Sequence, residues 1–308
     1  MTGVARARIT SDPVVLAEAS KLRHRVFVLE QGVDAALEFD GRDGAAAHVV
    51  LEDGSTLIGT ARIFDTGDEA VVGRVAVEAA RRGQGFGAIV MAAAERWASD
   101  HGLPAVELHA QQSVTGFYER LAYAGIGDPY EEAGIAHLTM RKELLPGLRP
   151  ATDDDSDGLI DLIAGVWTEY PSIVFDLDGE EPWLRAPASA YSGQGELWVL
   201  PFPDAGGLLA CAGWRPHPEG AELKSLYVAA PCRRQGWGSR LVRFIERRAG
   251  CQSSRARLRA WSDSRFTDSH QMYEQLGYRR TGASRELHDK SATVEFEFVG
   301  TAEGAGAA

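Results

Sequence analysis

A short glycine-rich segment that occurs twice constrains this chain more than any other feature. The stretch RRGQGFG at Arg81–Gly87 returns as RRQGWG at Arg233–Gly238, and the matching glycines lie 151 positions apart. Each copy follows a strand-like run, GRVAV or LKSLYV, and precedes an amphipathic helical pattern. Further along, FYERLAYAGIG has a counterpart in MYEQLGYRRTG. Because four features recur in the same order, we predict an internal duplication.

The length of the chain and a segment rich in proline and glycine near its middle agree with this prediction. A chain of 308 residues is long enough for two domains of about 150 residues each. The segment LLPGLRP at 144–150 carries two prolines and a glycine, which favours a boundary there. We therefore expect one domain at 1–145, a second at 146–300 and a disordered tail at 301–308. The acidic run at 153–157 lacks the closing Glu of a calcium loop and predicts a helix start instead.

The order of predicted elements indicates the fold class. Each half reads as strand, helix, several strands, helix, strand, helix and strand. Such an order predicts an α/β fold in which two tandem mixed β-sheets are each flanked by helices. The long insert Pro171–Gly195 is predicted to be a loop over the site rather than part of the core.

Composition excludes several function classes. A formal net charge of −12 argues against a nucleic-acid partner and favours a cationic one such as an amine. The sequence contains no run of about 18 apolar residues, so we expect no membrane span. The first residues lack the apolar core of a secretory signal. The three cysteines, Cys211, Cys232 and Cys251, lack metal-ligand spacing, so we expect reduced thiols, no metal and a cytoplasmic location.

The glycine loops carry the chemistry. Glycine lets the backbone approach a ligand closely, and free N–H groups at a helix N-terminus attract negative charge. Neighbouring arginines add charge-assisted hydrogen bonds, so the loops predict two pyrophosphate sites. Neither copy has the Gly-Lys-Ser/Thr of a P-loop or the first-strand position of a dinucleotide fingerprint. The predicted binding residues are Arg81, Arg82, Gly83, Gln84, Gly85, Phe86 and Gly87 in the first half, and Arg233, Arg234, Gln235, Gly236, Trp237 and Gly238 in the second.

Both halves resemble the GNAT acyltransferase superfamily, whose Arg/Gln-x-x-Gly-x-Gly/Ala loop holds the pyrophosphate of acetyl-CoA. The first half is similar to the ElaA-type subgroup through RVFVLEQG, FDGRD, FYERL and GIAHLTM, and the second resembles an uncharacterised GNAT group through WSDSRFTDSHQMYEQLGY. The resemblance implies that the strand before each loop, with Val75 and Val77 or Leu226 and Val228, pairs with the pantetheine arm. It also implies that Tyr118 and Tyr273 protonate the departing thiolate; the alternative is that both tyrosines are packing residues.

The expected function is an acetyl-CoA-dependent N-acetyltransferase in which a primary amine attacks the thioester directly. Several GNAT enzymes place a basic glutamate eleven positions before the loop arginine, where this chain has Glu222 in the second half and Val71 in the first. This difference assigns the principal chemistry to the second half. Glu222 could instead be a solvated strand-end carboxylate, and substitutes in the first half are Glu30, Glu38 or His109.

The alternative function is a regulatory protein that senses acyl-CoA and is non-catalytic or only partly catalytic. The acceptor is expected to be an amine of a small molecule or peptide, and the protein a monomer or a homodimer. His137 is predicted to be a structural or surface residue.

Overall fold

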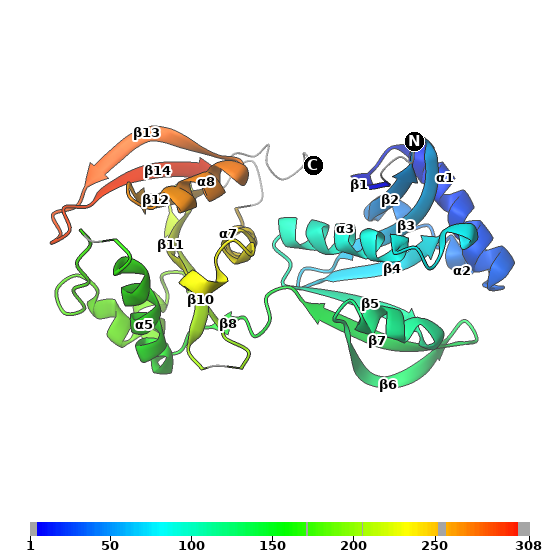
Figure 1. Ribbon diagram of the computed structural model, residues 1–308, viewed down its shortest axis with the longest axis horizontal. Helices are drawn as coiled ribbons and strands as arrows, with labels where there is room; N and C mark the ends of the chain where they lie inside the picture. The colour runs from blue at the N-terminus through cyan, green and yellow to red at the C-terminus, as the bar shows by residue number, and fades with distance from the viewer. Residues whose placement is uncertain (1–4, 171, 205, 252–256, 301–308) are drawn as a thin grey trace. The chain divides into compact units, whose positions relative to one another are not determined.

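The computed structural model describes residues 5–170, 172–204, 206–251 and 257–300. The chain divides into two compact units, and the change from one to the other in sequence falls between Leu144 and Leu145. The elements of both units are labelled in Figure 1. The tail predicted to be disordered, 301–308, lies outside the described residues.

The N-terminal unit is built on a seven-stranded sheet with the strand order β1-β2-β3-β4-β5-β7-β6. Its strands are β1 (Arg6–Thr10), β2 (Ala47–Asp53), β3 (Thr56–Asp65), β4 (Ala70–Val77), β5 (Ala105–Gln111), β6 (Ala124–Glu132) and β7 (Ile135–Glu143). Its helices are α1 (Pro13–Arg23), the π-helix η1 (His24–Glu30), α2 (Ala35–Glu38), η2 (Asp43–Ala45), η3 (Ala79–Arg81), α3 (Phe86–Asp100), η4 (Gln112–Val114) and α4 (Thr115–Glu119).

The C-terminal unit has its own seven-stranded sheet, with the order β13-β14-β12-β11-β10-β9-β8. Its strands are β8 (Arg149–Pro150), β9 (Glu196–Pro201), β10 (Leu208–His217), β11 (Gly220–Val228), β12 (Arg257–Asp263), β13 (Tyr278–Glu286) and β14 (Val294–Gly300). Its helices are η5 (Asp153–Asp155), α5 (Ser156–Trp167), η6 (Pro182–Arg185), α6 (Pro187–Tyr191), η7 (Ala230–Cys232), α7 (Trp237–Arg248) and α8 (Thr267–Gln275).

The two sheets repeat one topology. Read from β8, the second order becomes β8-β9-β10-β11-β12-β14-β13, which matches the first strand by strand. In each sheet the fourth and fifth strands run parallel, β4 with β5 and β11 with β12, and the other neighbouring pairs are antiparallel. The predicted α/β class with two mixed, helix-flanked sheets is therefore confirmed.

A bulge interrupts the fourth strand of each sheet at equivalent positions. Arg74 on β4 has φ 54° and Ser225 on β11 has φ 51°, a conformation that non-glycine residues rarely adopt. The parallel pairing stops just before the bulge, at Val72 with Leu108 and at Leu223 with Ala260. Beyond these pairs the two parallel strands are no longer hydrogen-bonded to each other, which leaves backbone groups at that end of the sheet for another partner.

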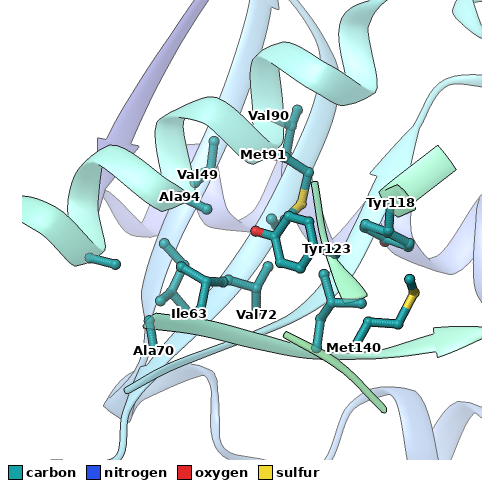
Figure 2. Packing of buried hydrophobic residues seen from close by; sticks show 14 of the residues in the cluster. Val49, Ile63, Ala70, Val72, Val90, Met91, Ala94, Tyr118, Tyr123 and Met140 are labelled. Carbon is teal, nitrogen blue, oxygen red and sulfur yellow. The ribbon is translucent and has the colours of Figure 1, made fainter. Parts of the chain in front are cut away.

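Each unit has a core between its sheet and the helix that follows the glycine loop. In the N-terminal unit the apolar face of α3, with Val90, Met91 and Ala94, packs against Val72 and other strand residues (Figure 2). Helix α7 packs its own buried face against the second sheet. None of the helices within the described ranges has the length and apolarity required to cross a bilayer.

The acidic run after the boundary begins helical structure, as predicted. Thr152 and Asp155 form a reciprocal capping box at the start of η5, and α5 follows directly. Asp155 also accepts two hydrogen bonds of 2.7 Å from the guanidinium of Arg149. The arginine and the cap together fix where the first helix of the second unit starts.

The prediction for the insert Pro171–Gly195 is wrong in part, because much of this segment belongs to a core. The segment forms η6 and α6, and the side chains of Leu184 and Tyr191 are 0% and 4% exposed. Both pack with Leu159 and Ile163 of α5. A segment rich in proline and glycine can still bury apolar side chains when short helices place them against a neighbouring surface. The positions of proline and glycine in the sequence do not reveal such burial.

Candidate active site

The first glycine loop connects β4 to α3. Gly83 and Gly85 have φ 74° and 85°, a left-handed conformation that other residues adopt only with strain. Within the part of the chain that the structure describes, the backbone amides of Gly83, Gly85 and Gly87 donate no hydrogen bond. A β-carbon added at Gly87 would lie 3.0 Å from the Phe117 ring, so only glycine allows this close approach to α4. Free amides at the start of a fifteen-residue helix can donate hydrogen bonds to an anion.

The second loop repeats this geometry between β11 and α7. Gly236 has φ 84°, and Arg234 with φ 63° takes the left-handed position that Gly83 holds in the first loop. A β-carbon at Gly238 would lie 2.9 Å from the sulfur of Met272 on α8. The duplication therefore extends from the sequence to backbone conformation and to the contact between the two helices.

The two loop arginines that match each other bind protein groups. Arg82 donates to the carbonyl of Val77 at 3.1 Å, and its two Nη atoms lie 2.5 and 2.8 Å from the carboxylate of Glu30. Arg233 makes the equivalent bonds, to the carbonyl of Val228 at 3.0 Å and to Glu169 at 2.6 and 2.7 Å. Both guanidinium groups thus hold the loop to the end of its strand and to a glutamate at the end of η1 or just after α5.

The other predicted loop residues differ in what they contact. Arg81 lies 2.6 Å from Asp53, and Arg234, whose side chain is 74% exposed, lies 3.6 Å from Asp268. The amides of Gln84 and Gln235 bond backward to the carbonyls of residues 80 and 231 and stiffen the loop. Of these four side chains, Arg234 is the one positioned to meet an anion from solvent.

A cavity of about 1070 Å³ opens beside the first loop. Every predicted binding residue of this half except Gln84 lines it: Val75, Val77, Arg81, Arg82, Gly83, Gly85, Phe86 and Gly87. Tyr118, visible at the edge of the core in Figure 2, also lines it, and burial raises the pKa of Tyr118 to about 12. The tyrosine is therefore a protonated donor over the whole physiological range of pH. Val71, His109 and His137 also line the cavity, and that His137 is a structural or surface residue stays a prediction.

A smaller cavity of about 470 Å³ lies beside the second loop. The predicted residues that line it are Leu226, Val228, Arg233, Arg234, Gly236, Trp237 and Gly238. Glu222 and Tyr273 are not among its lining residues. Tyr273 is 4% exposed and its ring lies 5.6 Å from that of Tyr278 and 5.3 Å from that of Phe298, and burial raises its pKa above the ordinary value.

Glu222 lies on β11 among basic side chains. Its Oε1 atom is 2.6 Å from Nζ of Lys224 and 4.0 Å from the guanidinium of Arg285, and the side chain is 18% exposed. The carboxylate is therefore already paired with a cation. The sequence signal that singled out Glu222 was its separation of eleven residues from Arg233 along the chain. That separation does not show that Lys224 and Arg285 lie beside the carboxylate.

Sequence reasoning missed a buried ionic network in the N-terminal unit. Arg62 bonds to both carboxylate oxygens of Asp40 at 2.7 Å and to Asp43 at 2.7 Å, and these bonds hold the pKa of Asp40 well below its ordinary range. Glu38, 2% exposed, lies 2.5 Å from Arg23 and 2.7 Å from Arg74. Asp40 and Asp43 belong to the motif FDGRD and Glu38 directly precedes it, but only the fold shows which arginines neutralise them.

The comparison with known families agrees with this geometry. The Acetyltransferase (GNAT) domain family matches residues 15–144, and the Acetyltransferase (GNAT) family matches residues 160–278. An N-acetyltransferase of Bacillus subtilis, YjcF, is 32% identical over 139 residues, which cover 45% of this chain and 99% of that protein. The chain belongs to the GNAT acetyltransferases and contains two such domains.

Further relatives match the N-terminal half. Protein ElaA of Escherichia coli is 32% identical over 131 residues, which cover 41% of this chain and 85% of ElaA. The crystal structure of Escherichia coli ElaA aligns with a TM-score of 0.42 and 27% identity, over 46% of this chain and all of that one (100%). The resemblance of the first half to the ElaA-type subgroup is confirmed.

Proposed function

We propose that the protein transfers an acetyl group from acetyl-CoA to a primary amine by direct attack of the amine on the thioester. The observation that supports this most strongly is the glycine loop beside a cavity in each domain. The loop connects a strand end that is not paired with its parallel neighbour to a helix N-terminus with free backbone amides. These residues fit an acyl-CoA, because the amides suit a diphosphate and the strand end can pair with an amide-bearing pantetheine arm. We propose the domain limits 1–145 and 146–300, which include both cavities.

In the N-terminal domain the proposed acid is Tyr118. Its hydroxyl has no hydrogen-bond partner among the described residues, and its side chain lines the cavity that also contains Gly85 and Gly87. A protonated phenol in that position can donate to a leaving thiolate as the C–S bond breaks. Bound acyl-CoA would supply the activated carbonyl group.

For the C-terminal domain, Glu222 and Tyr273 are the proposed base and acid. A second candidate function is that this domain binds acyl-CoA without turnover, so that the protein is only partly catalytic. Two observations favour the second candidate: neither residue lines the cavity, and Glu222 is paired with Lys224.

The proposed function is tested by thiol release from acetyl-CoA with a panel of amines, together with calorimetry of acetyl-CoA binding. We expect binding and amine-dependent release of free CoA by the full chain. Glu222→Gln lowers turnover by about 10²-fold if this carboxylate is the base, and leaves it unchanged if the C-terminal domain only binds. If the chain binds acetyl-CoA but releases no thiol with any amine, the protein is an acyl-CoA sensor and not an enzyme.

A further inference from the structure

The two domains differ on the face of the sheet that lies opposite α3 or α7. In the N-terminal domain, Val72 and Leu108 are paired neighbours buried in the core with α3. Since side chains alternate along a strand, Val71 and its neighbour Glu107 point to the other face, and His109 points the same way as Glu107. Val71 and His109 both line the large cavity, so a second substrate in the cavity can reach these side chains.

In the C-terminal domain the same face is covered. Tyr191 of α6 lies over Gly213 of β10, where an added β-carbon would be 2.9 Å from its ring, and its hydroxyl is 3.0 Å from that of Ser225 on β11. The guanidinium of Arg215, the residue paired with Glu222 across the strands, stacks 4.8 Å from the Tyr191 ring. In the second domain α6 of the segment between the first helix and the second strand thus places an aromatic ring on this face. In the first domain residues 31–46 reach the equivalent positions, Arg62 and Arg74, with the carboxylates of Asp40 and Glu38, and border the cavity.

Of the three residues that could replace a base at Val71, two are already bound. Glu30 is bonded to both Nη atoms of Arg82, which holds the pKa of Glu30 below its ordinary value. Glu38 is 2% exposed, with Arg23 and Arg74 on its two oxygens. A carboxylate held by guanidinium groups is a poor proton acceptor because it must give up these bonds to take the proton.

His109 has the surroundings of a base. Its side chain is 46% exposed and lines the cavity, and its Nδ1 atom is hydrogen-bonded to the hydroxyl of Tyr130 on β6. The hydroxyl of Tyr130 can accept a hydrogen bond from Nδ1–H, and in that tautomer the lone pair of the ring is on Nε2. Nε2 lies 3.7 Å from a carboxylate oxygen of Glu107, so an imidazolium formed there faces a negative charge.

We infer that acyl transfer takes place in the N-terminal domain, with Nε2 of His109 as the base that removes the proton of the acceptor amine. The inference rests on the proposed function. The N–C bond forms as the C–S bond breaks; the amine proton passes to Nε2, and the thiolate takes the proton of the Tyr118 hydroxyl. Exchange with solvent restores the neutral imidazole and the phenol. Tyr130 and Glu107 are positioning residues: Tyr130 accepts a hydrogen bond from Nδ1–H, and Glu107 stabilises the imidazolium.

The test uses the full chain with acetyl-CoA and the amine of the panel that releases thiol fastest. His109→Ala is expected to lower kcat by about 10²-fold or more with little change in the KM for acetyl-CoA, and added free imidazole is expected to restore part of the rate. Rescue by imidazole distinguishes a lost base from a lost structural contact. His217→Ala, in the second domain, is the matched control and keeps the wild-type rate, and melting temperatures confirm that each variant is folded.

Three outcomes would overturn the inference while the proposed function stands. These are an unchanged kcat in His109→Ala, a loss with imidazole rescue in His137→Ala instead, and a loss confined to Glu222→Gln. A wild-type chain that binds acetyl-CoA but releases no thiol with any amine would refute the proposed function and this assignment together.

Discussion

At the scale of single residues, the same side chain has the same partners in both domains. Arg82 and Arg233 each bond to the carbonyl of the last residue of the preceding strand and to a glutamate at the end of η1 or just after α5. Such an arginine neutralises the glutamate and presses the loop against the strand end. An arginine next to a predicted phosphate site therefore acts first on the shape of the loop, and the free amides of the glycines remain for the ligand.

The tyrosines of the two domains give a residue-scale prediction. Tyr118→Phe is expected to lower kcat by about ten- to a hundredfold, because the phenol is lost while the ring and its packing stay. Since the pKa of Tyr118 is raised to about 12, its hydroxyl is protonated throughout pH 6 to 10, and the loss is expected to be constant over that range.

Tyr273→Phe is the matched variant in the second domain. If that domain only binds acyl-CoA, the rate of Tyr273→Phe equals that of the wild type at equal melting temperature. The measurement is kcat against pH for the three proteins. A lower kcat in Tyr273→Phe, with an unchanged kcat in Tyr118→Phe, would show that acyl transfer takes place in the C-terminal domain.

At the scale of elements, the bulge in the fourth strand and the segment before the second strand decide what each sheet can bind. The bulges at Arg74 and Ser225 end the parallel pairing in both domains, so both have an unpaired strand end beside the loop. The segments differ: residues 31–46 border a large cavity, whereas 168–195 contributes buried side chains to a core. The bulge is thus common to both domains, and the segment before the second strand distinguishes them.

Leu184 tests the role of the second segment. Its side chain is 0% exposed within the cluster formed with α5, so Leu184→Ala is expected to lower the free energy of unfolding by about 2–5 kcal/mol. Chemical denaturation of the full chain measures this, with Val174→Ala, an exposed position (44%) in the same segment, as the control. A changed KM without loss of stability would instead assign 168–195 to a lid over the site.

At the scale of the whole molecule, two similar loops on one chain predict two binding sites for the same coenzyme. Each loop has two residues with positive φ, Gly83 and Gly85 or Arg234 and Gly236, and a cavity at the helix N-terminus. If the C-terminal domain lacks an open acceptor face, its bound acyl-CoA is not consumed there. The chain would then combine one site for turnover with one for binding alone.

Calorimetry with acetyl-CoA is expected to give a stoichiometry near two per chain. Gly85→Val and Gly236→Val place a β-branched residue at φ 85° and 84°, which is strained, so each is expected to reduce the stoichiometry to about one. The two variants also act as controls for each other: Gly85→Val is expected to abolish thiol release and Gly236→Val to leave it. A wild-type value of one that Gly85→Val does not change would show that the first loop does not bind.

The sequence by itself determined the duplication, the fold class and the position of both glycine loops. These features depend on local rules: glycines at fixed offsets, strand and helix periodicity, and the order in which they recur along the chain. The resemblance to GNAT enzymes, and not these local rules, singled out Tyr118 and the residues of β4 and β11 that precede the loops. The resemblance also raised the question of a base in the first domain, for which the sequence offered three residues without deciding among them.

Only the tertiary structure decided which of these residues are available for chemistry. Glu30 and Glu38 are bound by arginines from distant parts of the chain, Glu222 is bound by Lys224 and approached by Arg285, and His109 faces the cavity. The burial of Leu184 and Tyr191 likewise depends on helices that pack from elsewhere in the sequence. The physical reason is that charge pairing and burial are properties of three-dimensional neighbours, which a local pattern does not specify.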